Sequence, residues 1–260
     1  MNFPWFDIQH IIIGLLVLLR VSTLIILLPA IGHQLVPRQV KAGLIILLSF
    51  LIYPVVQHQV NTVPTAPLVF AVIALQEILL AAALALFAQL IFTAAQFAGQ
   101  LISFQMGMTV ANVFDPATHS QQSVLSQVAM TLAMLLWLSS GAHHMFLHAL
   151  IDSFSQFPID HAWHFNALLE LSDAMAQMFV LSLKIAAPIM ILLTFVYIAL
   201  GLVARAVPQV QVFFISFPLT VGLGLLTFAL GMPAVIMLLH DAFSTLPQQL
   251  PLFLRHLAGN

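Results

Sequence analysis

The 260-residue chain carries more apolar surface than a domain of its size can bury, because 62% of its residues are hydrophobic and only 5% are charged. Globular domains carry about 25% charged residues, so this composition predicts a membrane protein or a chain enclosed by similar chains. The formal net charge of −2 gives no electrostatic basis for nucleic acid binding, and the lack of cysteine excludes disulfides and thiolate metal sites.

The first apolar run, 11–31, follows a start that has no basic residue, MNFPWFDIQH. A cleaved signal peptide needs a positively charged start, so this run is expected to be retained as a helix long enough to span a bilayer. Arg20 lies in its middle, where a charge is costly unless it faces a partner or water. The other interpretation is that Arg20 snorkels or bonds a neighbouring carbonyl. Arg38 and Lys41 follow in a short loop, which the positive-inside rule places in the cytoplasm.

A second apolar run, 42–56, is expected to end at Pro54, and a third is unusually long for one helix, 68–107. Small residues four positions apart crowd the long run, a spacing that lets helices approach closely. The pairs are Ala81 with Ala85, Ala94 with Ala98, and Ala95 with Gly99. Glu77 also lies in this run and forms a candidate buried ion pair with Lys184, because buried charges are usually paired. The alternative is that each of the two meets water or another subunit.

The second half of the long run carries a narrow, uncharged polar stripe. Its members follow at steps of four and three residues, which places them on one face of a helix: Gln89, Thr93, Gln96, Gln100, Ser103 and Gly107. The stripe could line an aqueous pore, bond partner helices, or satisfy itself inside a bundle. The residues alone favour bonding between helices, the common role of Gln and Ser in apolar surroundings.

A polar break follows the stripe. The residue before a proline is pushed out of the α region, so Asp115–Pro116 predicts a helix end. Thr118 or Ser120 is then expected to cap the next helix, which runs on from Val124.

Three histidines follow this helix, after the interruption at 139–141. His144 and His148 are four residues apart and share a helical face, as zinc-binding histidines do. However, neither a neighbouring glutamate nor a fitting third ligand accompanies them and His143. We therefore interpret them as structural or interface histidines and expect no metal.

The polar stretch 154–166 predicts a boundary between two halves, 1–160 and 161–260. The second half is predicted to be a helical hairpin with arms 175–207 and 212–240, in which Pro188 kinks the first arm, followed by a short tail, 241–260. A phosphate-binding G-x-x-x-x-G-K-[ST] motif is absent, and no Ser/His/Asp arrangement has a recognisable surrounding motif, so neither an enzyme nor a cofactor is expected.

Several segments, in order and spacing, resemble the FliR-like family of type III export-gate proteins (FliR, SpaR and EscT). They are Gln105-Met106-Gly107, Phe114-Asp115-Pro116, Gly141 with His143, Asp152-Ser153-Phe154, and the flanking stretches RVSTLIILLPAIGHQLVPRQVKAGL and RAVPQVQVFFISFPLTVGLGLL. Injectisome export gates share much of this pattern. The Phe114-Asp115-Pro116 region is more similar to the flagellar branch.

The resemblance implies an all-α, integral-membrane-type protein of kinked helical hairpins, built to pack into a helical hetero-oligomeric export gate. Residues 1–160 would be a FliP-like half with a plug loop, and 161–260 a FliQ-like half. The implied partners are FliP, FliQ, FlhB and FlhA, unfolded protein substrates in transit, and membrane lipid, with no nucleic acid. The implied location is the flagellar basal body in the bacterial inner membrane.

The resemblance also implies that the loop 110–122 plugs the closed pore. Apolar side chains in and just before this loop suit a dry constriction, which blocks ions by dewetting: Met106, Met108, Val110, Val113 and Phe114. The remaining two plug candidates, Asp115 and Pro116, would fix where the chain turns. The alternative function is a secondary transporter or an ion channel subunit for a small solute. It would use Arg20, Glu77 and Lys184 as charges within the membrane.

Overall fold

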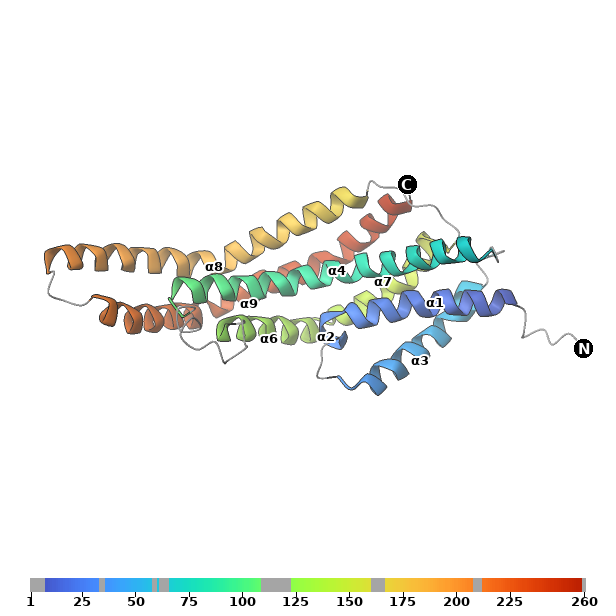
Figure 1. Ribbon diagram of the computed structural model, residues 1–260, viewed down its shortest axis with the longest axis horizontal. Coiled ribbons are helices and arrows are strands. Elements are labelled where there is room, and N and C mark those ends of the chain that lie inside the picture. The colour runs from blue at the N-terminus through green and yellow to red at the C-terminus, as the bar shows by residue number, and fades with distance from the viewer. Residues whose placement is uncertain are drawn as a thin grey trace, which may run out of the picture. The chain divides into compact units, whose positions relative to one another are not determined.

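The computed structural model describes residues 8–32, 36–57, 60, 66–108, 123–159, 167–207 and 212–258. Throughout these ranges the elements are α-helices (Figure 1), which confirms the predicted all-α class. In chain order they are α1 (Ile8–Leu27), α2 (Pro29–Gly32), α3 (Arg38–Gln57), α4 (Pro67–Gln105), α6 (Val124–Ser139), α7 (Ala142–Gln156), α8 (Ala167–Ala206) and α9 (Val212–Ala258).

Five of the described helices, α1, α3, α4, α8 and α9, are long and apolar enough to cross a membrane, and α6 with α7 would make a sixth, broken span. This confirms the membrane-type composition. Helices α4, α8 and α9 contain 39, 40 and 47 residues. At about 1.5 Å per residue they are about 58, 60 and 70 Å long, whereas a bilayer core is about 30 Å thick. Each is therefore far longer than a simple perpendicular span needs.

The chain forms two compact units. The first unit comprises Met1–Leu90, Gly141–Ala174 and Ser244–Asn260, and the second comprises Ile91–Ser140 and Met175–Phe243. Helices α4, α8 and α9 each contribute to both units. Each unit is therefore assembled from separate stretches of the chain. The predicted division into a FliP-like half, 1–160, and a FliQ-like half, 161–260, concerns family resemblance and stays a prediction.

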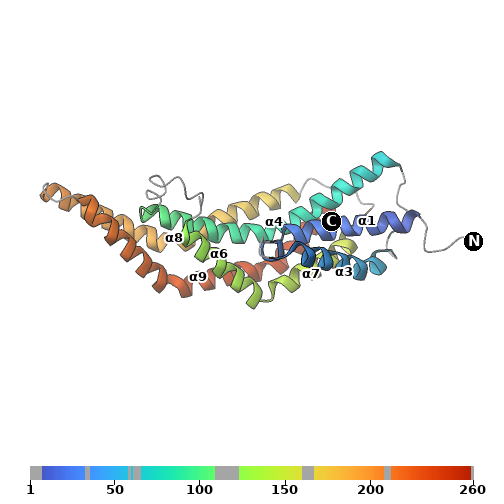
Figure 2. The ribbon, with the colours of Figure 1, turned by 60° about the horizontal axis from the view of Figure 1, so that its bottom comes forward.

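In the first unit, α3 lies beside α1 in both views of the ribbon (Figures 1 and 2). The buried face of α1 recurs every three or four residues, the spacing of one helical stripe: Ile13, Leu16, Val17, Val21, Leu24 and Ile25. Phe87 of α4 meets Phe253 of α9 edge to face, with ring centroids 5.1 Å apart. Near the surface, Glu170 of α8 pairs with His256 of α9.

In the second unit, an aromatic cluster joins three helices. Phe92 of α4, Trp137 of α6 and Phe243 of α9 have ring centroids 5.5–5.6 Å apart. Helices α4 and α6 touch through backbone, because a Cβ built on Gly99 would lie 2.6 Å from the Cα of Ser126. The expected small-residue faces of α4 are buried at all six positions, which is what close helix approach requires.

Several helix boundaries differ from those expected. Helix α3 continues past Pro54 to Gln57. In apolar surroundings the backbone groups beyond a proline still need partners, and helix supplies them. The N-cap of α6 is Ser123, not Thr118 or Ser120, and its hydroxyl accepts a hydrogen bond from the Ser126 amide at 3.1 Å.

The expected tail, 241–260, is also wrong, because α9 continues to Ala258. A stripe of apolar residues, spaced as one helical face, holds this stretch in the first unit despite its two prolines: Leu246, Leu250, Phe253, Leu254 and Leu257. Burial of an amphipathic face contributes more to helix stability in proteins than intrinsic propensity does.

Candidate functional site

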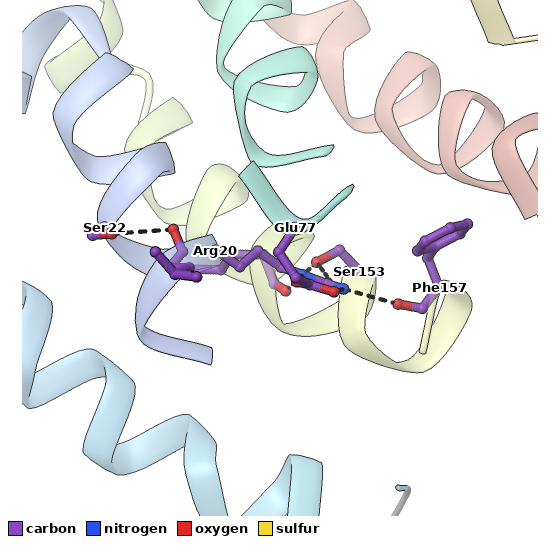
Figure 3. A network of polar contacts seen from close by, with 7 residues as sticks. Arg20, Ser22, Glu77, Ser153 and Phe157 are labelled. Atoms are coloured by element: carbon purple, nitrogen blue, oxygen red, sulfur yellow. Dashed lines mark hydrogen bonds and ion pairs between the residues drawn. The ribbon is translucent and has the colours of Figure 1, made fainter. Parts of the chain in front are cut away.

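Two charged side chains of the first unit meet in its core. Arg20 of α1 and Glu77 of α4 are 0% and 1% exposed, and they form a two-pronged ion pair (Figure 3). One hydrogen bond joins Arg20 Nε to Glu77 Oε2, and the other joins Arg20 Nη2 to Glu77 Oε1 at 2.8 Å. This fork geometry is the favoured arrangement of guanidinium and carboxylate.

The remaining guanidinium donors reach α7. Arg20 Nη1 donates to Ser153 Oγ and Nη2 donates to the Phe157 carbonyl, each at 3.1 Å. The guanidinium carbon also lies 4.0 Å from the centre of the Phe154 ring, a cation–π contact. The network therefore ties α1, α4 and α7 together with its charges neutralised and four of the five guanidinium N–H donors bonded, close to the condition under which buried charge is tolerated.

The suggested pair of Glu77 with Lys184 is wrong. Glu77 pairs with Arg20 instead, whereas Lys184 is exposed on α8. Arg20 does bond a neighbouring carbonyl, as one of the two interpretations held, but that carbonyl comes from Phe157 at the end of α7. Sequence spacing could not select these partners, because Arg20 and Glu77 are 57 residues apart and either charge could have met any other.

The second unit contains the other notable site, the C-terminal end of α4. Gly107 has φ of +78°, the left-handed conformation in which a glycine commonly ends a helix. The Gly107 amide donates to the Phe104 carbonyl at 3.0 Å, and the Met108 amide donates to the Ser103 carbonyl at 3.1 Å. This pair of bonds is a Schellman motif, and it ends α4 ten residues before the predicted stop at Asp115.

Hydroxyl groups from two other helices bind the last carbonyls of α4, which a helix leaves without internal partners. Tyr197 Oη of α8 donates to the Gln105 carbonyl at 2.8 Å, and Thr220 Oγ1 of α9 donates to the Met106 carbonyl at 3.1 Å. The Gln105 side-chain amide also donates to Thr194 Oγ1 of α8 at 3.2 Å. Within the second unit, α8 and α9 therefore hold the point where α4 stops.

The polar stripe of α4 changes its environment along the helix. Gln89 and Gln100 are exposed, Thr93 and Gln96 are half-buried, and Ser103 is buried. The Ser103 hydroxyl has no hydrogen-bond partner among the described residues. Exposure therefore varies from residue to residue along the stripe, and Ser103 is its one fully buried member, since Gly107 is half-buried. Whether the stripe lines a pore or bonds partner helices stays a prediction.

The plug candidates fall into two groups. Met106 is fully buried and Met108 is half-buried. The other five lie outside the described residues: Val110, Val113, Phe114, Asp115 and Pro116. Met106 is therefore placed inside the second unit, and its side chain has no surface in this chain with which to line a constriction.

The histidines lie on α7, in the first unit. The rings of His143 and His144 are tilted by 40° to each other, with centroids 4.1 Å apart, and His144 and His148 are exposed on one face. Among the described residues, no group of three His, Cys, Asp or Glu side chains could hold a metal ion.

Comparison with known proteins identifies the family. Residues 11–246 match the family described as bacterial export proteins, family 1. The chain belongs to the FliR family of bacterial export proteins. It is 36% identical over 228 residues to the flagellar biosynthetic protein FliR of Escherichia coli strain K12, which covers 87% of each chain. It is 30% identical over 239 residues to FliR of Bacillus subtilis strain 168, covering 88% of this chain and 90% of that one.

A third FliR, from Pectobacterium carotovorum, is 33% identical over 226 residues, which is 86% of each chain. The family match runs from α1 into α9, and each of these FliR proteins covers 86–88% of this chain. Sequence reasoning missed Tyr197 and Thr220. The available signal was their polarity within long apolar runs, and Tyr197 is one of only two tyrosines.

Proposed function

We propose that this chain is a structural, non-enzymatic subunit of the flagellar protein export gate, in the bacterial inner membrane at the base of the flagellum. Its partners would be FliP, FliQ, FlhB and FlhA, and unfolded protein substrates would pass through the channel that it helps to form and close. The observation that carries the proposal is membership of the FliR family over residues 11–246. Relatives across this length bear the name of a flagellar biosynthetic protein.

The distribution of burial supports a role within an assembly. In the most apolar stretch of α1, 39% of residues are buried within the chain, compared with 22% in α8 and 17% in α9. Large apolar side chains stand exposed on both later helices, among them Phe179, Phe195, Leu202, Phe214, Leu230 and Met237. Exposed apolar surface of this extent is typical of protein or lipid contact.

The lengths of the helices support an assembly that extends beyond the bilayer. Helices α4, α8 and α9 exceed the bilayer thickness about twofold, so part of each would pack against sibling subunits. In this arrangement the 1–160 half would take a FliP-like place in the ring and contribute the plug loop. The 161–260 half would take a FliQ-like place.

The structure weakens the alternative function, a secondary transporter or an ion channel subunit, because two of its three candidate charges are buried in an ion pair. That function needs Arg20 and Glu77 to be available to a solute or an ion, but each is the other's partner in a closed network. Lys184 is then the only one of the three candidate charges that is exposed. A lone exposed lysine does not define an ion pathway.

The test is stoichiometric assembly. The chain would be expressed alone and together with FliP-like and FliQ-like partners, purified in the same detergent, and analysed by native mass spectrometry. We expect a polydisperse, poorly behaved sample from the chain alone and one defined complex of different subunits after co-expression. A stable, folded monomer or homo-oligomer that does not bind the co-expressed partners would contradict the proposal.

A further inference from the structure

The end of α4 is fixed by side-chain packing as well as by hydrogen bonds. The Met106 side chain fills the space above Gly224 of α9. A Cβ built on Gly224 would lie 2.3 Å from the Met106 Cε, 2.8 Å from its Cγ and 3.0 Å from its Sδ. Separations under 3.0 Å are not found between real atoms of this kind, so a side chain at position 224 would force the Met106 side chain to shift from this position.

This requirement is specific to one glycine of α9. At Gly222, two residues away, and at Gly231, a Cβ would meet nothing within 4 Å. Glycine is a poor helix former, so its presence at 224, beneath a fully buried methionine, has a local packing reason. The hydroxyl of Thr220, one turn earlier on α9, binds the carbonyl of the same Met106.

We propose that Tyr197, Thr220 and Gly224 are positioning residues: they form a clasp that grips Gln105 and Met106 and so fixes where the chain leaves α4. The clasp is made wholly within the second unit by residues of α4, α8 and α9. In this role Met106 is an anchor and not a member of the constriction. The clasp stays closed during export, so that the position at which the chain leaves α4 does not change. The link to channel closure rests on the proposed function.

The geometry of the clasp also favours a disulfide that would lock it. A Cβ at position 224 would lie 2.8 Å from the Met106 Cγ, and the Met106 Cβ is one bond of about 1.5 Å away, so the two Cβ atoms are at most about 4.3 Å apart. Disulfides need about 3.5–4.5 Å between Cβ atoms. The natural chain has no cysteine, so Met106→Cys with Gly224→Cys introduces a single possible intrachain bond.

The first experiment locks the clasp in the co-expressed complex. We expect the double cysteine variant to oxidise readily, as seen by a mobility shift that a reductant reverses, and to export substrate at the same rate when oxidised and reduced. A Met106→Cys, Gly222→Cys pair serves as the control that should not cross-link. If the oxidised complex stops exporting and reduction restores export, the clasp has to open and the proposal is overturned.

The second experiment breaks the clasp without changing its shape. Tyr197→Phe with Thr220→Val removes the two hydroxyls, whereas Thr220→Ser alone keeps a hydroxyl at both positions. The position of the α4 end is measured directly by spin labels on Met108→Cys and Gln127→Cys, the latter an exposed residue of α6. We expect the hydroxyl-free variant to broaden the distance distribution and raise dye or ion leak several-fold, whereas Thr220→Ser should leave both unchanged.

The two readouts separate this proposal from the proposed function. If the hydroxyl-free variant keeps a narrow distribution of distances between the two spin labels, the clasp does not position the chain and the inference is wrong. If the distribution broadens but the complex stays tight, while deletion of 110–119 leaks, the plug stands and the clasp has no part in closure. If that deletion does not leak either, the plug role fails, and the spin-label result alone decides whether the clasp holds the end of α4.

Gly224→Ala tests the clasp independently of the two hydroxyls. The added methyl group has to displace the Met106 side chain, so the spin-label distribution should broaden as it does without the hydroxyls. Gly222→Ala is the matched control on the same helix, since nothing lies within 4 Å of its Cβ. Equal behaviour of the two alanine variants would refute the packing half of the clasp.

Discussion

Arg20 and Glu77 form a buried ion pair in which the guanidinium of α1 grips both carboxylate oxygens of α4. Their positions are 57 residues apart in the chain, and the same guanidinium also reaches the carbonyl of Phe157. The pair therefore fixes the relative placement of three helices within the first unit. Neither charge is exposed to water. Removing one partner should therefore lower the free energy of unfolding much more than breaking an exposed ion pair does.

The first prediction concerns this pair. Arg20→Met should destabilise the assembled complex by about 3–5 kcal/mol, because it leaves an uncompensated carboxylate in the core. Arg20→Met with Glu77→Met should recover much of that loss, since the buried charge is then gone. The measurement is thermal or denaturant unfolding of the purified complex.

A surface pair serves as the control for the first prediction. His256→Gln removes the partner of Glu170, at a site where the two side chains are 47% and 26% exposed. Exposed pairs contribute about 0–1 kcal/mol, so this variant should unfold close to the wild-type midpoint. If Arg20→Met proved as mild as His256→Gln, the network would not organise the first unit.

The second prediction concerns the contact of α4 with α6. Gly99→Ala should destabilise the second unit by about 1–3 kcal/mol, the usual range for overpacking, because the new methyl group meets the Ser126 backbone at 2.6 Å. Backbone cannot rotate away as a side chain can. Gly43→Ala, where a Cβ meets nothing within 4 Å, is the control. The readout is the yield and unfolding midpoint of the complex, and two indistinguishable variants would contradict the close approach.

The third prediction concerns the plug. Deletion of Val110–His119 in the assembled complex should make cells leaky to small ions and dyes, because the apolar segment that follows the polar stripe is lost. Phe114→Ala should do the same more weakly. Dye uptake and single-channel conductance measure the effect, with assembly checked by native mass.

The control for the plug comes from another connection between helices. Trp163→Ala removes an aromatic side chain from the segment between α7 and α8 and should leave the channel tight. Phe157 is unsuitable for this purpose, because it is buried and its carbonyl accepts a hydrogen bond from Arg20. A deletion complex that assembles normally and conducts nothing would remove the plug role and return the stripe to helix packing.

The fourth prediction concerns the histidines of α7. His144→Gln with His148→Gln should leave assembly and export unchanged, with no dependence on added metal, because two histidines without further ligands make a weak site. Elemental analysis of the purified complex should find no stoichiometric zinc. Zinc that is present in the wild-type complex and lost in the double variant would show that a partner subunit completes a metal site.

The helices could be predicted from sequence because long apolar runs have few stable structures. The run 68–107 is helical almost throughout, as expected. In apolar surroundings the backbone N–H and C=O groups of a long segment need hydrogen-bond partners within the chain, and a helix supplies them. Boundaries were harder to predict. The spacing of Gly107 places it on the stripe, although a glycine at the end of an apolar run is also a common helix stop, which is its role here. Pro54 predicts a helix end, yet α3 continues to Gln57.

The partners of single side chains were beyond sequence reasoning. Glu77 was paired with Lys184 because both lie in apolar runs, and nothing local distinguished Lys184 from Arg20 as a partner. The clasp was missed for a similar reason: Tyr197 and Thr220 bind backbone carbonyls about a hundred residues away in the chain. Carbonyl acceptors leave no pattern in the side-chain sequence, so such contacts become visible only when the fold is known.

The unequal burial of the helices has a consequence for the life of the chain in the cell. Helix α1 has much of its packing within the chain, whereas α9 depends on other surfaces to cover Phe214 and Leu230. A chain that finds no partners keeps that face open, and poorly packed regions are where proteolysis begins. Surplus copies should therefore be degraded first from the α8–α9 side, so that the amount of the protein is set by the supply of its partners and not by its own synthesis.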